Sequence, residues 1–236
     1  MSEYQPMNPA RVVESTDPEP ALLFSCEHAG NALPAGVDAR GLIESHWAFD
    51  LGAAELVADI ARRLGAPAVL APFSRLWIDP NRSPRDPELI VQSCGGHPIP
   101  FNLGIDAAER EHRQLRWHGG FHDRLAEEIS KHASLRLLVS IHTFTPTLRG
   151  LERPYSLGVL HDGPSDSVRA LFRALRSEGF DPRDNEPYSG FDGMIYSIAR
   201  HGVESGVPYV ELEVRNDKTR STMPARLARA LRSALD

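Results

Sequence analysis

Short apolar segments alternate with amphipathic segments along most of the chain. Apolar runs without a helical period predict buried strands at 21–26, 67–78 (as two extended pieces), 135–141, 157–160 and 207–214. Apolar residues that recur at helical spacings predict helices over 46–64, 106–132, 165–178, 194–201 and 222–235. Strands that alternate with helices are typical of an α/β fold with a mainly parallel sheet.

Local residues mark where several of these elements begin and end. Gly65 is a natural stop for the helix over 46–64, and Ser165 or Asp166 is the expected N-cap of the helix over 165–178. Gly119 and Gly120 are expected to interrupt the helix over 106–132.

The segments outside the regular elements differ in character. Residues 1–20 are polar and contain prolines, so we expect a loose N-terminal arm. Residues 83–104 are rich in proline and glycine and predict a long surface loop, a kind of segment that is often functional. Because no repeat or linker divides the rest, residues 21–236 are expected to form a single catalytic domain.

Composition narrows the class of protein. A chain of 236 residues can bury a sizeable core without a disulfide or a metal. It has no apolar run of roughly 18 residues and no secretory signal, so we expect a soluble protein with no membrane partner. The two cysteines, Cys26 and Cys94, cannot build a disulfide framework or a four-cysteine zinc site, which favours a reduced, cytoplasmic location. The net charge of -6 argues against a nucleic-acid partner.

Polar residues of catalytic types follow four of the predicted strands. In open α/β sheets, functional residues gather at the carboxyl ends of the strands. The residues at these ends are Glu27, His28, Asp79, Asn81, Arg82, His142, Thr143, Glu211 and Glu213. Their common position predicts one site at this edge of the sheet.

Two of the ten histidines stand at separate strand ends and can converge on one metal ion. These are His28 and His142. A catalytic zinc ion usually takes three protein ligands and leaves one position open. The third ligand is expected to be a carboxylate, either Glu27 or Asp50 in the first turn of the helix over 46–64.

A second histidine pair is a weaker candidate for a metal site. His118 and His122 are four residues apart on the predicted helix, a spacing that can bind zinc. The glutamate of the H-E-x-x-H motif is missing, and the two glycines between the histidines weaken the helix. A partly exposed helical face is therefore favoured, with His122 kept as a polar contact of the cleft.

The last predicted strand offers a general base. Glu211 and Glu213 lie two residues apart and therefore share one face of the strand. Either carboxylate can take a proton from a metal-bound water. Arg75, Arg82 and Arg215 stand beside the strand ends, where a guanidinium can bind a substrate carboxylate through two hydrogen bonds.

Two other functions are weighed against a metal hydrolase. Cys26 stands two residues before His28, so a cysteine nucleophile is conceivable, but Cys26 and Glu27 point to opposite faces of the strand. A binding protein without metal, on the same fold, is the other alternative. The chain has no G-x-S-x-G elbow, no P-loop and no dinucleotide motif.

An ordered set of short segments resembles the N-formylglutamate amidohydrolase family. The set covers about residues 20–220 and consists of SCEHAGN (25–31), HWAFDLGA (46–53), SRLWIDPNR (74–82), SIHT (140–143), NEPYSG (185–190) and EVRND (213–217). The family is more distantly similar to zinc carboxypeptidases and aspartoacylases. The resemblance implies a three-layer α/β/α fold of the zinc-exopeptidase type, with a mixed, mainly parallel sheet of about eight strands and one zinc ion.

The resemblance also implies a metal site. His28 and His142 match the two histidine ligands of the wider group. The usual His-x-x-Glu spacing is not met, because Asn31 occupies the place of the glutamate. Asp50 is therefore the expected acidic ligand, and Glu27 is the alternative.

Roles for the remaining residues follow from the same resemblance. Glu213 resembles the glutamate that activates the zinc-bound water, and Arg75 resembles the arginine that polarises the scissile carbonyl. Asn81 and Arg82 resemble the pair that holds the substrate carboxylate, and Tyr188 is expected to line the pocket. The expected activity is hydrolysis of the amide bond of a small anionic N-acyl amino acid such as N-formylglutamate.

Overall fold

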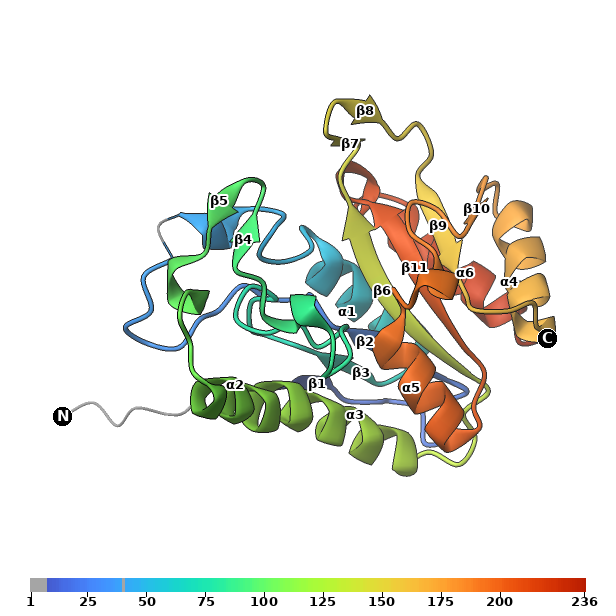
Figure 1. Ribbon diagram of the computed structural model, residues 1–236. Coiled ribbons are helices and arrows are strands. Elements are labelled where there is room, and N and C mark those ends of the chain that lie inside the picture. The colour runs from blue at the N-terminus through green and yellow to red at the C-terminus, as the bar shows by residue number, and fades with distance from the viewer. Residues whose placement is uncertain (1–7, 40) are drawn as a thin grey trace.

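A seven-stranded mixed sheet forms the centre of the computed structural model, which describes residues 8–39 and 41–236 (Figure 1). In spatial order its strands are β1 (Arg11–Val13), β3 (Ala68–Leu70), β2 (Leu22–Cys26), β6 (Leu137–Phe144), β11 (Tyr209–Arg215), β9 (Leu157–Leu160) and β10 (Arg183–Asp184). The four strands β3, β2, β6 and β11 run parallel, while β1 and β9 run antiparallel to their inner neighbours. The prediction of a mixed, mainly parallel sheet is confirmed, with seven strands in the described residues rather than about eight.

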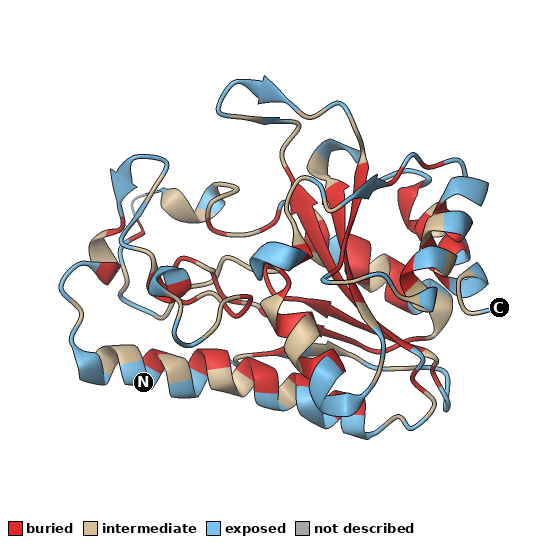
Figure 2. Cartoon of the chain, turned by 45° about the vertical axis from the view of Figure 1, so that its right-hand side comes forward, coloured by how far each residue is buried: buried red, intermediate tan, exposed pale blue. Residues whose placement is uncertain are grey.

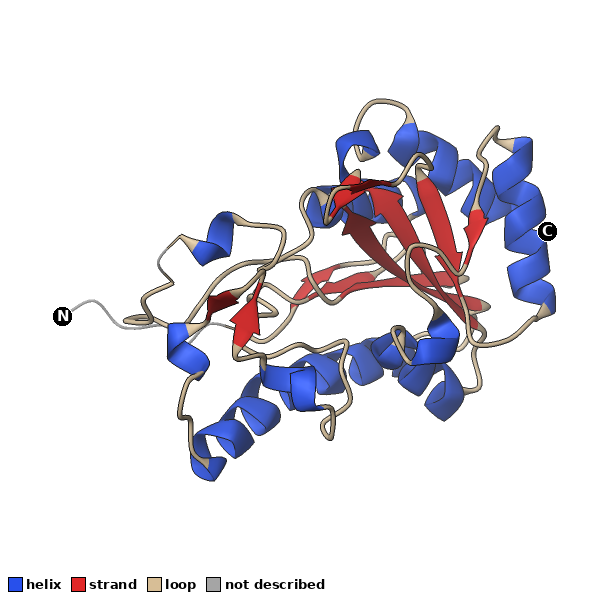
Figure 3. Cartoon of the chain, turned by 45° about the horizontal axis from the view of Figure 1, so that its top comes forward, coloured by secondary structure: helices blue, strands red, loops and turns tan. Residues whose placement is uncertain are grey.

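Helices cover both faces of the sheet and complete three layers (Figure 3). One face packs against α1 (Ala53–Leu64), α4 (Asp166–Ser177) and α6 (Met223–Ser233). The other face packs against α3 (Gly120–Ser130) and α5 (Tyr196–Ser205). The strands are buried almost throughout, and the helices are buried along the side that meets the sheet (Figure 2). The expected N-cap Ser165 accepts a hydrogen bond from the backbone N–H of Val168.

Three predicted segments differ from the structure by more than small shifts of their ends. The helix expected over 46–64 begins only at Ala53, because Gly52 adopts a left-handed conformation with φ 80° and residues 46–52 form turns. The second extended piece within 67–78 does not form a strand, and β3 ends at Leu70. Residues 1–7 lie outside the described part of the chain, whereas Arg11–Val13, expected within a loose arm, pair with β3.

The segment predicted as one interrupted helix over 106–132 is continuous but changes its winding. It consists of α2 (Ala107–Arg113), a π-helical segment (Gln114–Gly119) and α3. The expected interruption near the two glycines is therefore a wider helical turn that ends at Gly119. His118 within this segment contacts the carbonyl of Arg82, a predicted site residue, and π-helical segments are frequent at functional sites.

Two hairpins project beyond the carboxyl ends of the central strands (Figure 1). The first, β4 (Ser93–Cys94) with β5 (His97–Pro98), belongs to the loop predicted over 83–104, which also contains short 3-10 helices at Pro87–Ile90 and Pro100–Asn102. The second is β7 (Thr147–Leu148) with β8 (Leu151–Glu152). Among residues 8–39 and 41–236, no helix has the length and apolar character needed to cross a membrane.

Candidate active site

A ladder of polar side chains crosses the central strands on the face that packs against α3 and α5. Ser25 of β2 pairs with Ser140 of β6, and Ser140 pairs with Glu211 of β11. One step further toward the carboxyl ends, His142 pairs with Glu213. The intervening residues of each strand point to the opposite, apolar face because side chains alternate along a strand.

The polar ladder opens into a cavity of about 810 Å³. Both hairpins contribute to its wall, Cys94 from β4–β5 and Arg149 from the turn of β7–β8. The predicted site residues that line the cavity are His28, Asp50, Arg75, Asn81, Arg82, His142, Tyr188 and Glu213, together with Asp79 and Glu211. The expected convergence at the carboxyl edge of the sheet is therefore present for most of the predicted residues.

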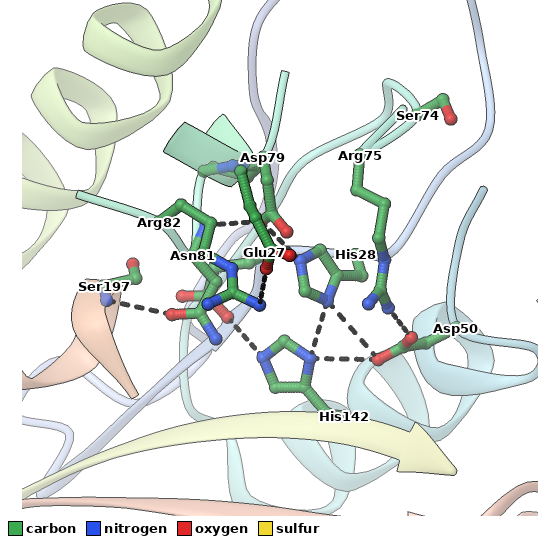
Figure 4. Close-up of polar contacts among 12 residues, drawn as sticks. Glu27, His28, Asp50, Ser74, Arg75, Asp79, Asn81, Arg82, His142 and Ser197 are labelled. Atoms are coloured by element: carbon green, nitrogen blue, oxygen red, sulfur yellow. Dashed lines mark hydrogen bonds and ion pairs between the residues drawn. The ribbon is translucent and has the colours of Figure 1, made fainter. Parts of the chain in front are cut away.

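His28, Asp50 and His142 converge at the bottom of this cavity (Figure 4). The Nδ1 atoms of the two histidines lie 3.0 Å apart, and Asp50 Oδ2 lies 2.9 Å from His142 Nδ1 and 3.7 Å from His28 Nδ1. The backbone N–H of Thr143 donates a hydrogen bond to the same Asp50 oxygen. Three potential ligand atoms from three separate segments therefore surround one point.

Carboxylates hold the far nitrogen of each histidine. His28 Nε2 lies 2.7 Å from Asp79 Oδ1, and His142 Nε2 lies 3.1 Å from Glu27 Oε2, which also accepts a hydrogen bond from Ser140 Oγ. When each Nε2–H donates to its carboxylate, Nδ1 keeps a free lone pair for a ligand. This carboxylate–histidine arrangement is the one that orients histidine ligands in metal sites.

Buried negative charge dominates this group. Burial alone would raise the pKa of Asp50, but Arg75 and both histidines hold that pKa well below its usual range. Burial also opposes ionisation of Glu27, yet its bonds with His142 lower the pKa to about 2. Burial disfavours a charged His142, but Glu211, Asp50 and Glu27 outweigh it and raise the pKa of the imidazole. The site therefore favours an added positive charge.

The geometry fits a zinc ion. In a tetrahedral site with bonds of about 2.0–2.1 Å, neighbouring ligand atoms lie about 3.3–3.4 Å apart. The three separations of 2.9, 3.0 and 3.7 Å bracket that value. Two histidines with one carboxylate are also a donor set found in catalytic zinc sites.

The acidic residue of this group is Asp50, and Glu27 has a different position. Asp50 lies in the turn before α1 rather than in the first helical turn. Glu27 is fully buried behind His142, and its Oε1 has no hydrogen-bond partner among the described residues. Glu27 therefore orients His142 and does not face the ligand position.

The two carboxylates of β11 have different surroundings. Glu211 Oε2 accepts a hydrogen bond from Asn81 Nδ2 at 3.3 Å and lies 3.4 Å from His142 Nε2. Glu213 Oε2 is buried in the cavity wall and has no partner among the described residues. Burial raises the pKa of Glu211 to about 7 and raises that of Glu213 well above its usual value. Of the two, Glu213 is the carboxylate with a buried oxygen that no described residue contacts by a hydrogen bond.

Arg75 lies beside Asp50 at the cavity wall. Its guanidinium forms an ion pair with Asp50 Oδ1, and its backbone N–H donates to the carbonyl of Ala48. The buried Nε of Arg75 has no partner among residues 8–39 and 41–236. Its charge is therefore only partly used by the protein itself.

Asn81 and Arg82 are already engaged within the protein. Asn81 Nδ2 donates to the carbonyl of Met194 and to Glu211, and Asn81 Oδ1 accepts from the backbone N–H of Ser197 at the start of α5. The Arg82 guanidinium lies 3.5 Å from Asp86 and 3.4 Å from Glu88. Asn81 thus connects β11 to α5, and both residues have less capacity for a substrate carboxylate than the motif implied.

Tyr188 lines the cavity, as expected, because its loop approaches the sheet very closely. A Cβ atom on Gly158 would lie 1.7 Å from the carbonyl oxygen of Glu186. Only glycine at this position of β9 leaves space for the loop that carries Tyr188.

Arg215, predicted to bind substrate, is not among the residues that line the cavity. Its Nε donates to Asp217 at 2.8 Å, and its Nη1 donates to the carbonyl of Arg153 at 3.0 Å. It is the last residue of β11, and both of these partners lie outside the strands of the sheet.

His122 is also outside the cavity and is not a polar contact of the cleft. It is buried in α3, where its Nε2 lies 3.0 Å from the carbonyl of Pro80 and its Nδ1 lies 2.9 Å from His201 Nε2. Because a carbonyl only accepts, His122 Nε2–H donates to Pro80 and His201 Nε2–H donates to His122 Nδ1. His118 likewise contacts the carbonyl of Arg82, so these histidines support the loop over 79–82 from behind.

We expect the buried pair His122 and His201 to make the protein less stable in acid. Burial lowers the pKa of His201 to about 4 in the folded protein. As the pH falls, the unfolded chain therefore binds a proton on His201 at a higher pH than the folded protein does. The stability that the neutral His201 contributes is present above pH 6.5, the usual pKa of histidine, and is lost as the pH falls toward 4. Between pH 7.5 and 5 the loss is about 2 kcal/mol. Urea unfolding at both pH values measures it.

The matched control for this stability measurement is an exposed histidine. His201→Gln should flatten the change in unfolding free energy with pH, whereas the same substitution at the exposed His97 should not. If His201→Gln keeps the slope of the unsubstituted protein, His201 does not carry the effect.

The cysteine alternative does not fit this geometry. Cys26 is fully buried in the apolar cluster on the opposite face of the sheet, against α1. Burial raises the pKa of its thiol far above the usual value. A protonated thiol that faces away from the cavity cannot act as the nucleophile.

Two outer residues received no site role from the sequence. Asp79 is one of the strand-end residues that predict the site, without a role of its own, and it contacts His28; Ser140 contacts Glu27. Polar residues at alternate positions of buried strands were the available signal, since Ser25 precedes Glu27 and Ser140 precedes His142 by two residues.

A protein-family model agrees with the motifs noted in the sequence. Residues 20–219 match the model of the N-formylglutamate amidohydrolase family. No curated protein sequence matches the chain.

Solved structures with the same fold cover nearly the whole chain. The gene product Atu2144 from Agrobacterium tumefaciens is 29% identical, with a TM-score of 0.87 over 96% of this chain and 94% of that one. The N-formylglutamate amidohydrolase from Ralstonia eutropha JMP134 is 18% identical, with a TM-score of 0.72 over 97% and 98% of the two chains.

Proposed function

Since this chain belongs to the N-formylglutamate amidohydrolase family, we propose that it is a zinc-dependent amidohydrolase of small anionic N-acyl amino acids. N-formylglutamate is the expected substrate, residues 21–236 act as one catalytic domain, and the cytoplasm is the expected location. The observation that carries the proposal is the convergence of His28, Asp50 and His142 in one cavity with Glu213, whose Oε2 has no partner among the described residues.

His28, Asp50 and His142 would hold the metal. When bound there, a zinc ion would supply a Lewis acid for the scissile carbonyl and would lower the pKa of the attacking water toward about 7. Asp79 and Glu27 keep both imidazoles turned toward the same point.

Glu213 acts as the proton carrier. It takes a proton from the water that attacks the amide carbon, and the raised pKa of this buried carboxyl makes it a stronger base than a solvated glutamate. After the C–N bond breaks, Glu213 returns the proton to the leaving amine. The products are formate, or another carboxylate, and the free amino acid.

Arg75 stabilises the negative charge that develops on the carbonyl oxygen. Its guanidinium stands at the cavity wall next to Asp50, and its Nε has no partner among the described residues. A fixed cation that needs no rearrangement during the reaction is effective in this role. A binding protein without metal would have no chemical use for a buried carboxylate such as Glu213, whose Oε2 has no partner among the described residues.

We expect the purified protein to release glutamate from N-formylglutamate and to lose this activity when zinc is removed. The measurement is the rate of free amine release from N-formyl, N-acetyl and N-succinyl amino acids, together with zinc content by elemental analysis. Adding zinc to chelator-treated protein is the control and should restore the rate. Full activity after complete metal removal would contradict the proposal.

A further inference from the structure

The residues expected to bind a substrate carboxylate are largely occupied by the protein. Asn81 uses both amide hydrogens within the protein, and Arg82 faces Asp86 and Glu88. Arg75 is paired with Asp50. An anionic substrate therefore needs positive charge from another part of the cavity.

Two arginines of the β7–β8 hairpin, Arg149 and Arg153, are free of such partners. Neither of these hairpin arginines has an ion pair with any described residue. Arg149 lines the cavity at the tip of the hairpin and is exposed. It has φ 50° and is followed by Gly150 at φ 80°. A tight hairpin turn with two positive φ values favours asparagine and glycine, so an arginine at this position is conformationally costly.

Arg153 stacks on two aromatic residues that line the cavity, although it is not itself one of the lining residues. Its guanidinium carbon lies 5.6 Å from the ring centre of Phe144 and 5.4 Å from that of Tyr188, and both rings line the cavity. Such contacts fix a guanidinium without neutralising its charge. Burial, Arg75 and then Arg153 lower the pKa of His46, another residue of the cavity wall.

The backbone of Arg153 is fixed on both sides. Its N–H donates to the carbonyl of Pro146 at 2.8 Å, and its carbonyl accepts from Arg215 at 3.0 Å. Arg215 is in turn held by Asp217. Arg215 thus contributes to this wall as a positioning residue, without contacting the cavity itself.

We propose that Arg149 and Arg153 form the subsite for the side-chain carboxylate of the substrate, so that the β7–β8 hairpin sets a preference for acidic N-acyl amino acids. The α-carboxylate lies next to the scissile amide, near the buried His28, Asp50 and His142. The β7–β8 hairpin lies at the exposed side of the cavity, where it would meet the side-chain carboxylate of the substrate. This inference rests on the proposed amidohydrolase activity.

The test compares N-formylglutamate with N-formylglutamine, which lacks the side-chain charge. In the double variant Arg149→Gln/Arg153→Gln, kcat/KM for N-formylglutamate should fall roughly 10- to 100-fold through KM. The value for N-formylglutamine should stay within about twofold. Arg153→Lys keeps a charge and should restore part of the preference. An unchanged ratio of the two kcat/KM values in the double variant would overturn the inference.

Arg183→Gln is the matched control, because Arg183 also stacks on a tyrosine, Tyr155, at 5.9 Å but pairs with Asp181. For Arg183→Gln, the ratio of the two kcat/KM values should equal that of the unsubstituted protein. A large fall of this ratio in Arg183→Gln would also count against the hairpin arginines. Calorimetry with glutarate and glutaramate gives a readout independent of hydrolysis. Hydrolysis of neither formyl substrate would reject the proposed function, whereas equal binding of glutarate and glutaramate would reject the subsite.

Discussion

Replacing Glu213 with glutamine is expected to lower kcat for N-formylglutamate roughly 100- to 10,000-fold, the range that a general base contributes. The amide has almost the same shape as the carboxylate but cannot take a proton from water. Because Glu213 makes no hydrogen bond through Oε2 with a described residue, the substitution breaks no contact there. The measurement is the initial rate at saturating substrate, with zinc content and thermal unfolding recorded for the same sample.

Glu211→Gln is the comparison for this experiment. Its side chain lies on the same strand face two residues earlier, but it is already bonded to Asn81. A glutamine can accept the same hydrogen bond, so the loss of kcat should be clearly smaller than for Glu213. If Glu211→Gln abolishes turnover while Glu213→Gln retains most of it, the two roles are reversed.

Removing the carboxylate of Asp50 should weaken zinc binding more strongly than any change in the outer contacts. Loss of an outer partner typically lowers metal affinity about 10- to 100-fold. We expect Glu27→Gln to fall within that range, because Glu27 meets the three converging residues only at the far nitrogen of His142. Asp50→Ala should exceed it and abolish hydrolysis, because Asp50 Oδ2 is one of the three converging atoms.

Competition with a chromogenic chelator measures both affinities. Asp50→Asn is the second variant if Asp50→Ala unfolds, because it keeps the volume and the N–H contact from Thr143. A protein that loses zinc through Glu27→Gln and keeps it in both Asp50 variants would make Glu27 the acidic ligand.

The sequence was most informative where burial alone decides the structure. The apolar runs at 21–26 and 135–141 correspond to β2 and β6, with shifts of at most three residues at their ends. The histidines at these ends could be placed together because parallel strands share one carboxyl edge. His142 lies inside β6 rather than after it, since the strand continues to Phe144.

Side-chain partners brought in by tertiary structure could not be read from spacing. His118 and His122 have the spacing of metal ligands, yet each contacts a backbone carbonyl of the loop over 79–82. Arg215 shares a strand with Glu213 but turns to Asp217. The position of the Arg153 guanidinium is set by the rings of Phe144 and Tyr188, which come from other parts of the chain. Which of several nearby groups a side chain contacts can be read only from the three-dimensional structure.

The parts of the proposed site enter the chain at very different times during synthesis. His142 is 114 positions beyond His28 and 92 beyond Asp50, and Glu213 follows on β11. Ribosomes add about 5–20 residues per second. A growing chain that has paired β2 with β6 contains all three converging ligands several seconds before it contains the base. The proposed metal ligands are therefore synthesised before the proposed base, and before β11, the strand that lies beside β6 in the finished sheet.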